Sequence, residues 1–476
     1  MTASYALDTL KVNTYGDPPH EQGPGVALTD LNGDGWLDVV YARRGGQPVW
    51  LMNVSGDLIP QGPIVAVSGS VPEAVAVAAA DLDGDGWQDI VLATPQGVRD
   101  VVLYNEKGAG FRVEELGPHE GERLTPSIAD VNGDGLADIF MGAYVHEFDP
   151  NTTTVSDGVT LYIQNATGGF DDVTAWLPKE VHEGLAFQGA WVDVDLDHDL
   201  DLYLAHDCYM DGACVLPPLL LLNDGTGQFS VAEECWCDNP ISAMGVAVGD
   251  TNNDRYPDLL VTNVGEYAHY QNAQDNSFIY ATQAAGLVPT VDYTYVSWAA
   301  RFDDLDLDGN LDLLVTFAPT DPMADRGALS AQPDRLFLGQ GGGQFVDGSE
   351  IAGFASNAKS RGLVTGDITG DGRPDVVIAT FDGMDVHTSS GGCPVGTTLV
   401  FSGGALVGTT VDVKVGGLTY TRHVFPSTSF SSSPMHVSLP VMESDYYDEI
   451  TVTWPDGTQK KLTTRQAGGQ VFVTRQ

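Results

Sequence analysis

A nine-residue acidic phrase that runs directly into an apolar strand constrains this chain more than any other feature. Its clearest copy is Asp-Leu-Asp-Gly-Asp-Gly-Trp-Gln-Asp at residues 81–89, followed by Ile-Val-Leu-Ala at residues 90–93. Oxygen-bearing side chains stand at positions one, three, five and nine, and a glycine stands at position six. Calcium takes about 6–8 oxygen ligands, which a loop supplies from alternate residues and from a backbone carbonyl at position seven. The spacing therefore predicts a calcium-binding loop.

The phrase differs from an EF-hand in how it ends. An EF-hand loop closes with a Glu at position twelve and continues as a helix. Here an Asp closes the loop at position nine, and the apolar, β-branched residues that follow are typical of a strand. The loop is therefore predicted to join two strands.

Seven copies of the phrase follow one another along the chain. Successive copies begin between 49 and 63 residues apart, and each keeps an Asp at position nine. A single copy is equally well explained as a tight turn, because Asp-Gly and Asn-Gly favour hairpins without any metal. Seven loops that each gather three or four mutually repelling carboxylates favour a bound cation instead.

We predict up to seven structural Ca²⁺ ions, with position seven included for its carbonyl oxygen. His198 and Arg255 stand where the fourth and fifth loops should have glycine, and Thr369 removes a charge from the seventh, so the occupancy of these three loops is left open. The predicted ligands, loop by loop, are Asp30, Asn32, Asp34, Trp36 and Asp38; Asp81, Asp83, Asp85, Trp87 and Asp89; Asp130, Asn132, Asp134, Leu136 and Asp138; Asp193, Asp195, Asp197, Asp199 and Asp201; Asp250, Asn252, Asp254, Tyr256 and Asp258; Asp304, Asp306, Asp308, Asn310 and Asp312; and Asp367, Thr369, Asp371, Arg373 and Asp375.

Each acidic loop belongs to a longer repeat. A strand precedes the loop, a second follows it, and a third is followed by a turn and an aromatic residue, as at residues 101–111 and 160–170. Four strands per repeat, seven times, predict an all-β fold, a seven-bladed β-propeller over residues 1–390. A sandwich or a solenoid is the alternative, but only a closed ring removes the edge strands. The seventh repeat lacks its last hairpin, so the strand near residues 5–14 is expected to complete that blade.

Charge and cysteine content restrict the environment. The chain has 66 acidic and 21 basic residues, a net charge of −45, which argues against nucleic acid or an anionic membrane as a partner. No apolar run is long enough to span a membrane. The N-terminus lacks the features of a signal peptide, and we expect one to have been removed from a secreted protein. Four cysteines cluster in one repeat: Cys208, Cys214, Cys235 and Cys237. Their clustering favours disulfides over free thiols or a metal site, but the sequence does not determine which cysteines pair. Cys393 stands alone.

The repeated units resemble known sequences. Asp-Leu-Asn-Gly-Asp-Gly-Trp-Leu-Asp-Val-Val and Asp-Val-Asn-Gly-Asp-Gly-Leu-Ala-Asp-Ile-Phe are similar to FG-GAP/VCBS repeats, which occur in integrin α-chain propellers and in many secreted bacterial proteins. The resemblance covers residues 25–380. It implies a calcium-binding propeller outside the cell.

The tail, residues 391–476, has no acidic loops and is predicted to be a small β domain. Its Val-Thr-Trp-Pro-Asp-Gly segment at residues 452–457 resembles the ASPIC/UnbV module, although the upstream part departs from that family. Propeller repeats followed by this module resemble the cartilage acidic protein family, which is secreted and binds calcium. From the residues alone, Trp454 is expected to be the buried side chain of a turn.

No catalytic residue could be assigned from sequence. The chain lacks the motifs of serine hydrolases, zinc proteases, P-loop and dinucleotide-binding enzymes. His182, His206 and Asp207 form an acid/base or metal set only if the fold brings them together. The irregular middle repeats carry aromatic residues and a histidine suited to a ligand site: Tyr209, Trp236, Tyr267, His269, Tyr293, Tyr295 and Trp298.

The sequence therefore leaves two hypotheses about the function open. The first is a secreted, monomeric adhesion or binding module for an extracellular glycan or protein ligand. The alternative is a propeller enzyme, a lyase, hydrolase or cyclase, with its site in the central channel or at the domain junction. The sequence leans against an enzyme.

Overall fold

A computed structural model describes residues 6–12, 24–42, 45–119, 121–144, 158–208, 214, 216–287, 295–319, 332–390, 396–441, 446–463 and 468–475. Within these ranges the ordered elements are β-strands and two short 3-10 helices, η1 (Thr174–Trp176) and η2 (Lys179–Glu183). Neither helix has the length or apolarity that crossing a bilayer requires. The predicted all-β class is confirmed.

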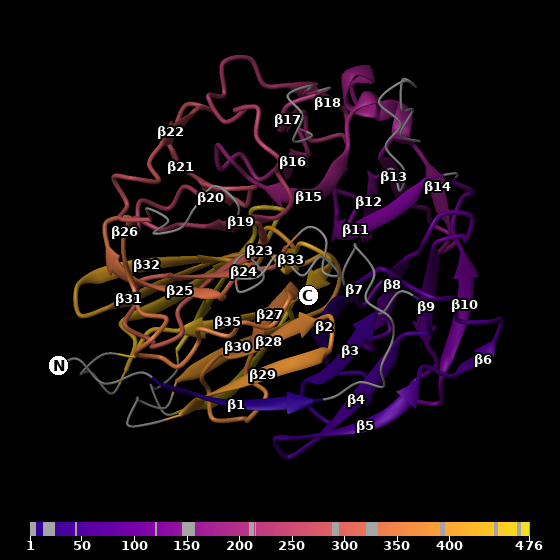
Figure 1. Cartoon of the computed structure of the whole chain (residues 1–476), viewed down its shortest axis with the longest axis horizontal. Coiled ribbons are helices and arrows are strands. Elements are labelled where there is room, and N and C mark those ends of the chain that lie inside the picture. The colour runs from indigo at the N-terminus through magenta and orange to yellow at the C-terminus, as the bar shows by residue number, and fades with distance from the viewer. Residues whose placement is uncertain are drawn as a thin grey trace.

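Four-stranded antiparallel units follow one another around a central axis in chain order (Figure 1), and one pairing, of Ala143 with Ala186, joins the third and fourth units into a single sheet. The sheets, from the innermost strand outward, are β2 (Gly25–Thr29), β3 (Asp38–Ala42), β4 (Val49–Val54) and β5 (Asp57–Pro63); β7 (Ala76–Ala80), β8 (Asp89–Ala93), β9 (Val101–Asn105) and β10 (Phe111–Glu115); β11 (Glu122–Ala129), β12 (Asp138–Tyr144), β13 (Thr160–Gln164) and β14 (Phe170–Asp172); β15 (Ala186–Val192), β16 (Asp201–His206), β17 (Leu219–Asn223) and β18 (Phe229–Val231); β19 (Val246–Gly249), β20 (Asp258–Val261), β21 (Ala268–Asn272) and β22 (Phe278–Tyr280); β23 (Ser297–Asp303), β24 (Asp312–Phe317), β25 (Arg335–Gly341) and β26 (Gln344–Asp347); and β27 (Ser360–Gly366), β28 (Asp375–Thr380), β29 (Gly383–Ser390) and β1 (Ala6–Val12). We call these sheets blades 1 to 7.

The blades form a closed ring. Each innermost strand contacts the next, and β27 of blade 7 contacts β2 of blade 1. Blade 2 gains a fifth strand, β6 (Ala66–Ser68), which runs parallel to β10 at its outer edge. Closure leaves the inner strands with neighbours on both faces, which is why β2, β3, β7 and β8 are buried along their whole length.

The N-terminal strand completes the last blade. β1 pairs antiparallel with β29 over its whole length, with Leu10 opposite Val386. It is therefore the outermost strand of blade 7, while β27 to β29 come from residues 360–390. Chain segments from the two ends of the repeat region thus share one sheet, and they join the ring there without leaving an open seam.

The C-terminal module consists of two sheets. One orders β35 (His436–Leu439), β30 (Thr397–Ser402) and β38 (Gly469–Thr474); the other orders β32 (Leu418–His423), β31 (Thr410–Val415), β36 (Glu449–Thr453) and β37 (Gln459–Leu462). Leu399 and Val437 of the first sheet share one apolar cluster with Val413 and Val452 of the second. Trp454 is buried in that cluster, with its ring edge-on to Phe401, as a structural turn residue.

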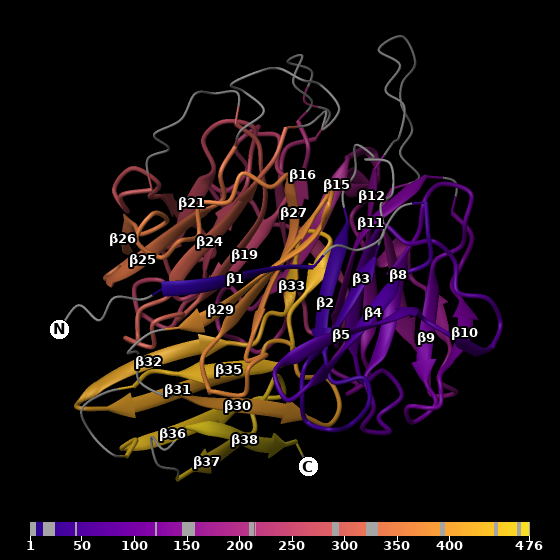
Figure 2. The same ribbon diagram turned by 60° about the horizontal axis from the view of Figure 1, so that its bottom comes forward.

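A hairpin of this module enters the central channel of the propeller. It spans residues 425–434 and contains β33 (Ser427–Thr428) and β34 (Ser431–Ser432); we call it the hub hairpin. In Figure 2 the C-terminal strands lie together beneath the propeller, and β33 reaches up among the blades. The predicted domain boundary near residue 390 stays a prediction, but a segment from beyond it lies inside the ring.

The hub hairpin makes contact with every blade. Its hydrogen bonds to six of them are Val26 N to Ser431 Oγ, Val77 N to Phe430 O, Phe430 N to Thr125 Oγ1, Gln188 Nε2 to Ser427 O, Arg301 Nη1 to Phe425 O and Thr365 N to Ser433 Oγ. In blade 5 the Cβ of any residue replacing Gly245 would lie 3.2 Å from Ser429 Cβ. The same Cβ would overlap with the Trp298 carbonyl of blade 6, so glycine at this position lets blade 5 approach both blade 6 and the hairpin closely.

Candidate metal centres on the loop face

Each acidic loop is held in shape by its own carboxylates. In loop 1, Asp30 accepts hydrogen bonds from the amides of Gly33 and Gly35, both at 2.8 Å. Asn32 accepts one from the Asp34 amide, and Asp34 one from the Trp36 amide. These short-range bonds turn the side chains at positions one, three and five towards the inside of the loop.

Position six needs a left-handed backbone. The glycines Gly35 and Gly86 have φ values of +87° and +89° there. His198 and Arg255 take the same position in loops 4 and 5 with φ values of +76° and +83°. The two loops therefore keep the loop geometry at the cost of strain that a glycine avoids.

Three loops gather three carboxylates each. One oxygen from each of three residues lies within 4.8 Å of the others in the sets Asp81, Asp83 and Asp85; Asp193, Asp195 and Asp197; and Asp304, Asp306 and Asp308. Loops 1, 3 and 5 have Asn at position three and loop 7 has Thr, so they bring fewer charges together.

The residues in these three clusters fit a cation. In each cluster one buried carboxylate oxygen accepts no hydrogen bond within the described residues: Asp81 Oδ1, Asp195 Oδ1 and Asp304 Oδ1. A buried anionic oxygen without a partner is costly, and like charges this close repel. A hard divalent ion bound by oxygen ligands would remove both costs, so Ca²⁺ suits the chemistry of the donor set.

The ninth Asp has a second task that the sequence did not reveal. In loop 2, Asp89 accepts the amide of Leu82 at 2.9 Å and the amide of Asn105 at 2.8 Å. The equivalent Asp in all seven loops accepts two such bonds, one from the amide at position two of its own loop and one from an amide on the third strand of its blade. The invariant Asp thus fastens each loop to its blade, whatever it also binds.

Burial strongly perturbs these ninth-position carboxyls. Desolvation raises the pKa of Asp38 and Asp89 to about 7 and that of Asp138 and Asp201 to about 8, although the backbone hydrogen bonds act in the opposite direction. Without a cation, burial therefore favours the protonated form.

A side-chain amide at the end of the third strand joins neighbouring blades. Asn105 Nδ2 of blade 2 donates to the carbonyl of Leu31 in loop 1 at 2.8 Å, while its Oδ1 accepts the Gly108 amide of its own turn. Five seams have this contact, which we call the amide clamp: Asn53 to Ile368 O, Asn105 to Leu31 O, Gln164 to Leu82 O, Asn223 to Val131 O and Asn272 to Val194 O.

The tryptophans at position seven pack against neighbouring loops. A Cβ at Gly33 of loop 1 would lie 3.1 Å from the Trp87 ring, and a Cβ at Gly370 of loop 7 would lie 2.7 Å from the Trp36 ring. Their side chains therefore cover the loop of the preceding blade, and the contact requires glycine there.

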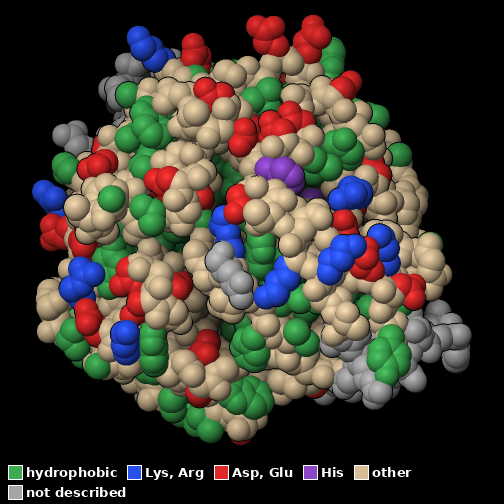
Figure 3. Space-filling view, turned by 180° about the vertical axis from the view of Figure 1, so that it is seen from behind, with side chains coloured by type: hydrophobic (Ala, Val, Ile, Leu, Met, Phe, Trp, Pro, Cys, Tyr) green, Lys and Arg blue, Asp and Glu red, His purple; other side chains and the backbone are tan. Residues whose placement is uncertain are grey.

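The last three loops each contact an arginine. Arg255 of loop 5 pairs with Asp412 of the C-terminal module at 2.9 Å, and Arg373 pairs with Asp371 within loop 7. In loop 6, Arg422 of the module donates to Asp304 Oδ2 at 2.7 Å and to the Gly309 carbonyl at 2.9 Å. Arg422 and Asp304 are both buried, so loop 6 forms part of the domain junction. On the face seen from behind in Figure 3, basic and acidic side chains lie next to one another.

The cysteines of the fourth repeat form two disulfides. Cys208 pairs with Cys214, and Cys235 pairs with Cys237. Disulfide bonding within the cluster is thus confirmed and its connectivity is settled. Cys393 lies outside the described residues.

The possible set of His182, His206 and Asp207 is not assembled. His206 Nδ1 contacts the Pro217 carbonyl, and burial lowers its pKa to about 4. Asp207 accepts a hydrogen bond from Tyr144, while His182 packs beside Gly158. Adjacent residues of a strand point to opposite faces, which separates His206 from Asp207.

The aromatic residues of the middle repeats serve different roles. Tyr267, His269 and Trp298 are buried, so the prediction that they line a ligand surface is wrong for them. Trp236 is 65% exposed, and Tyr295 is partly buried against Phe317. Tyr209 and Tyr293 lie outside the described residues.

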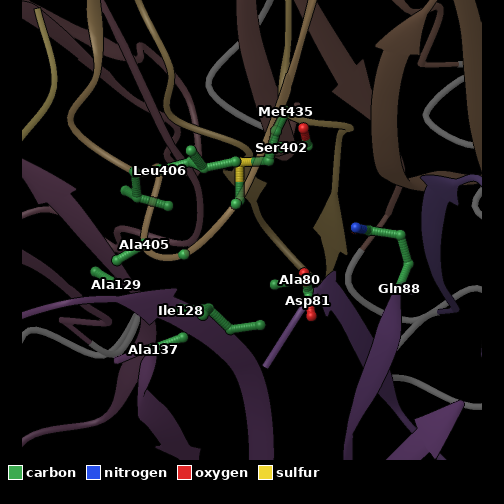
Figure 4. A pocket seen from close by; sticks show the side chains of 13 residues that line it. Ala80, Asp81, Gln88, Ile128, Ala129, Ala137, Ser402, Ala405, Leu406 and Met435 are labelled. Carbon is green, nitrogen blue, oxygen red and sulfur yellow. The ribbon is translucent and has the colours of Figure 1, made fainter. Parts of the chain in front are cut away.

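The domain junction holds a small cavity. Its volume is about 20 Å³, and Figure 4 shows Ile128, Ala129 and Leu406 lining it, with Asp81 to one side. A cavity of this size holds about one water molecule. A second, open hollow of about 360 Å³ lies between loops 2 and 3, and Asp83, Gln164 and Gly404 of the C-terminal module are among the residues that line it. The central channel itself is filled by the hub hairpin.

Family comparisons agree with the repeats. Residues 30–92, 81–141, 130–204, 250–315 and 320–378 match the FG-GAP-like repeat, and residues 402–476 match ASPIC and UnbV. Human Cartilage acidic protein 1 is 25% identical over 255 residues, which cover 50% of this chain and 36% of that protein. Mouse Integrin alpha-3 is 31% identical over 121 residues, covering 22% and 12%. The chain spans 36% to 42% of the length of the Cartilage acidic protein 1 sequences that it matches.

The solved structures that match this chain have low sequence identity to it. A streptogramin B lyase has a TM-score of 0.47 at 12% identity, covering 81% of this chain and 98% of that chain. An Agrocybe aegerita lectin that recognises non-reducing terminal N-acetylglucosamine has a TM-score of 0.44 at 16% identity, covering 76% and 86%. These scores carry no argument about function. The matched repeats cover more than half of the sequence, and the chain therefore belongs to the FG-GAP-like repeat family, with an ASPIC and UnbV module at its C-terminal end.

Proposed function

We propose that this chain is a secreted, monomeric β-propeller that Ca²⁺ stabilises and that binds a protein or glycan ligand outside the cell. The observation that carries the calcium part is the set of three carboxylate clusters, each with one buried oxygen that accepts no hydrogen bond in the described residues. An ion that binds only the folded state stabilises it by about 2.7 kcal/mol per site at a hundredfold excess over its dissociation constant.

Three features support a place outside the cell. The two disulfides suit an oxidising compartment. Loops of this kind use calcium at levels common outside cells. The matches to Cartilage acidic protein 1 and Integrin alpha-3 point the same way, although each covers only part of those proteins.

Binding is favoured over catalysis. The hub hairpin fills the channel, one of the two places in which the alternative enzyme would keep its site. The open hollow between loops 2 and 3, which reaches Gly404 of the module, is lined by loop carboxylates, amides and small residues, with no histidine, lysine or cysteine among the described residues. In the described residues, the candidate acid/base set in the fourth repeat is also dispersed. An adhesion or recognition role uses outer surfaces instead, which a rigid ring of blades presents well.

The test has two arms. Calcium bound per chain is measured by calorimetric titration for the wild type, for Asp83→Asn with Asp85→Asn, and for the charge-matched exposed control, Asp382→Asn with Asp448→Asn. We expect the loop variant to lose one calcium site and the control to lose none.

An array of glycans and matrix proteins is then probed with the wild-type protein in calcium and again in EGTA. Calcium-dependent hits support the proposal. Absence of calcium binding contradicts its calcium part, and absence of any hit with folded protein contradicts its binding part.

A further inference from the structure

One tryptophan is held on the outside of the propeller by an unusually firm support. Trp236 lies between Cys235 and Cys237, which form a disulfide with each other, and its side chain is 65% exposed. Both cysteines are buried in the apolar core between blades 4 and 5. The Tyr203 hydroxyl donates to the Cys237 carbonyl at 2.8 Å, and the Phe278 amide donates to the Cys235 carbonyl at 2.9 Å.

The support fixes the direction of the ring. Residues 235 and 237 anchor inward, so Trp236 between them must point outward. Glu234 and Trp236 both take positive φ, at +58° and +55°, a conformation that is uncommon for such residues. A large aromatic side chain that is exposed on a loop held rigid in an unfavourable backbone conformation is typical of a residue that anchors a binding partner.

Further apolar surface lies next to this tryptophan. The hydrogen bond between Phe278 and Cys235 places β22 directly beside the disulfide loop. Phe278 is buried, whereas Tyr280, which points to the same face of β22, is 45% exposed. Together with Trp236 it forms an exposed patch at the outer edge of blade 5, which we call the Trp236 patch.

The charges around the patch have one sign. Glu233, Glu234 and Asp238 flank Trp236 in sequence and are exposed. Between residues 180 and 300 the only basic side chain is Arg255, which is paired with Asp412 of the C-terminal module. An aromatic face bordered by carboxylates attracts a cation through both the ring and the charges.

We propose that the Trp236 patch is a docking site for a basic segment of a partner protein, in which a Lys or Arg side chain lies over the Trp236 ring and neighbouring cations face Glu233, Glu234 and Asp238. This inference rests on the proposed binding function and names its partner class. A neutral glycan stacked on the same ring is the competing occupant, and the acidic border favours the basic peptide.

The test uses the chain of residues 1–476, loaded with calcium and immobilised for biolayer interferometry. The probes are a synthetic peptide of alternating Arg and Ser, its Gly-Ser analogue, and an N-acetylglucosamine trimer. Trp236→Ala is compared with Phe472→Ala, which removes an aromatic ring that is also 65% exposed but lies on β38 of the C-terminal module. A third variant, Glu233→Gln with Glu234→Gln, removes charge and keeps the ring.

We expect the Arg-Ser peptide to bind and Trp236→Ala to weaken that binding about tenfold, while Phe472→Ala leaves it unchanged. The Glu-to-Gln variant should weaken binding several-fold and reduce its salt dependence. Equal binding by wild type and Trp236→Ala, or equal losses in the tryptophan and phenylalanine variants, overturns the inference. Binding of the sugar that depends on Trp236, with peptide binding that does not, assigns the patch to a glycan. A melting curve of every variant in calcium shows whether that variant is folded. The array of glycans and matrix proteins tests the proposed function independently, so a negative peptide result would contradict this inference without contradicting the proposed function.

Discussion

Five seams between blades are joined in one way and two in another. At the five, a side-chain amide of one blade donates to the loop of the preceding blade, as Asn105 does to Leu31. Blade 6 has Gly339 at the equivalent position, and the Gly343 amide reaches the Thr251 carbonyl of loop 5 instead. At the seam after blade 6, the C-terminal module contacts loop 6 through Arg422 and through the Val441 amide, which donates to Leu307.

The difference shows how similar repeats acquire different roles. The acidic loops share one motif, yet loops 5 and 6 are joined to the module by arginine ion pairs and lack the amide clamp on their second residue. In these loops the charge of Arg422 already offsets part of the carboxylate repulsion, because it acts on Asp250 of loop 5 as well as on Asp304 of loop 6. Among the described residues, loops 1 and 3 have no ion pair and loop 2 has only the exposed Lys107, 3.4 Å from Asp85, so these three loops should depend more on calcium.

Removing calcium should have the largest effect. We expect EGTA to lower the melting temperature by tens of degrees, because several buried carboxylate clusters lose their counter-ion at once. Differential scanning calorimetry measures it, and hydrogen exchange should show loops 1 to 3 opening before loops 5 and 6. An unchanged melting curve would refute the structural role of calcium. Equal rates of hydrogen exchange in all loops would contradict the difference proposed between loops 1 to 3 and loops 5 and 6.

Without calcium, stability should fall as pH rises. Burial raises the pKa of Asp89 to about 7 and of Asp201 to about 8, whereas an unfolded Asp titrates near 4. A raised folded-state pKa gives stability that is fully present below the unfolded value and is lost as pH rises through the folded value. In EGTA we therefore expect a higher melting temperature near pH 6 than near pH 8. Added calcium should flatten or reverse this slope, and an apo protein more stable at pH 8 would contradict the prediction.

Asp304→Asn should cost more than Asp81→Asn. Both remove the first carboxylate of a three-carboxylate loop, but the first also leaves Arg422 buried without its ion-pair partner. Stranding a buried charge typically costs about 3–5 kcal/mol. Urea unfolding in EGTA isolates this difference, because calcium no longer contributes in either variant. Equal losses would mean that Arg422 does not hold loop 6 to the module.

Asn105→Ala should give the smallest of these effects. It removes two donated hydrogen bonds and leaves the Leu31 and Gln88 carbonyls without them, at a cost of about 1–3 kcal/mol. Glu106→Gln, a change at the next, exposed position, is the matched control. The loss should persist in saturating calcium, since the clamp does not involve the ion. A loss seen only without calcium would show that the clamp acts through loop 1 occupancy.

Much of the fold could be predicted from the sequence. The acidic phrase is local, so the seven loops, the strand after each loop and the propeller class followed from spacing alone. The buried Trp454 turn was equally local. The calcium ligands themselves remain predictions, and their number is open.

The rest depends on contacts between distant residues. Arg422 and Asp304 are 118 positions apart, and Asn53 and Ile368 are 315 apart. An Asn at the start of a turn looks the same in sequence whether its side-chain amide faces water or a neighbouring blade. The hub hairpin, a run of serines and threonines around Phe430, looks like a polar surface turn until the ring around it is seen. Nor could a Cys-Trp-Cys triplet show by itself which of its side chains point inward.

The hub hairpin also bears on the order in which the chain is made. Ribosomes complete residues 425–434 after all the blades, so a ring that assembles during synthesis does so around an axis that is still empty. Phe187 and Trp298, whose rings pack on Phe430 in the finished molecule, lack that partner until then. A stop codon just before residue 425 would therefore remove a contact from every blade. It should lower the yield of folded propeller, and not only delete the C-terminal module.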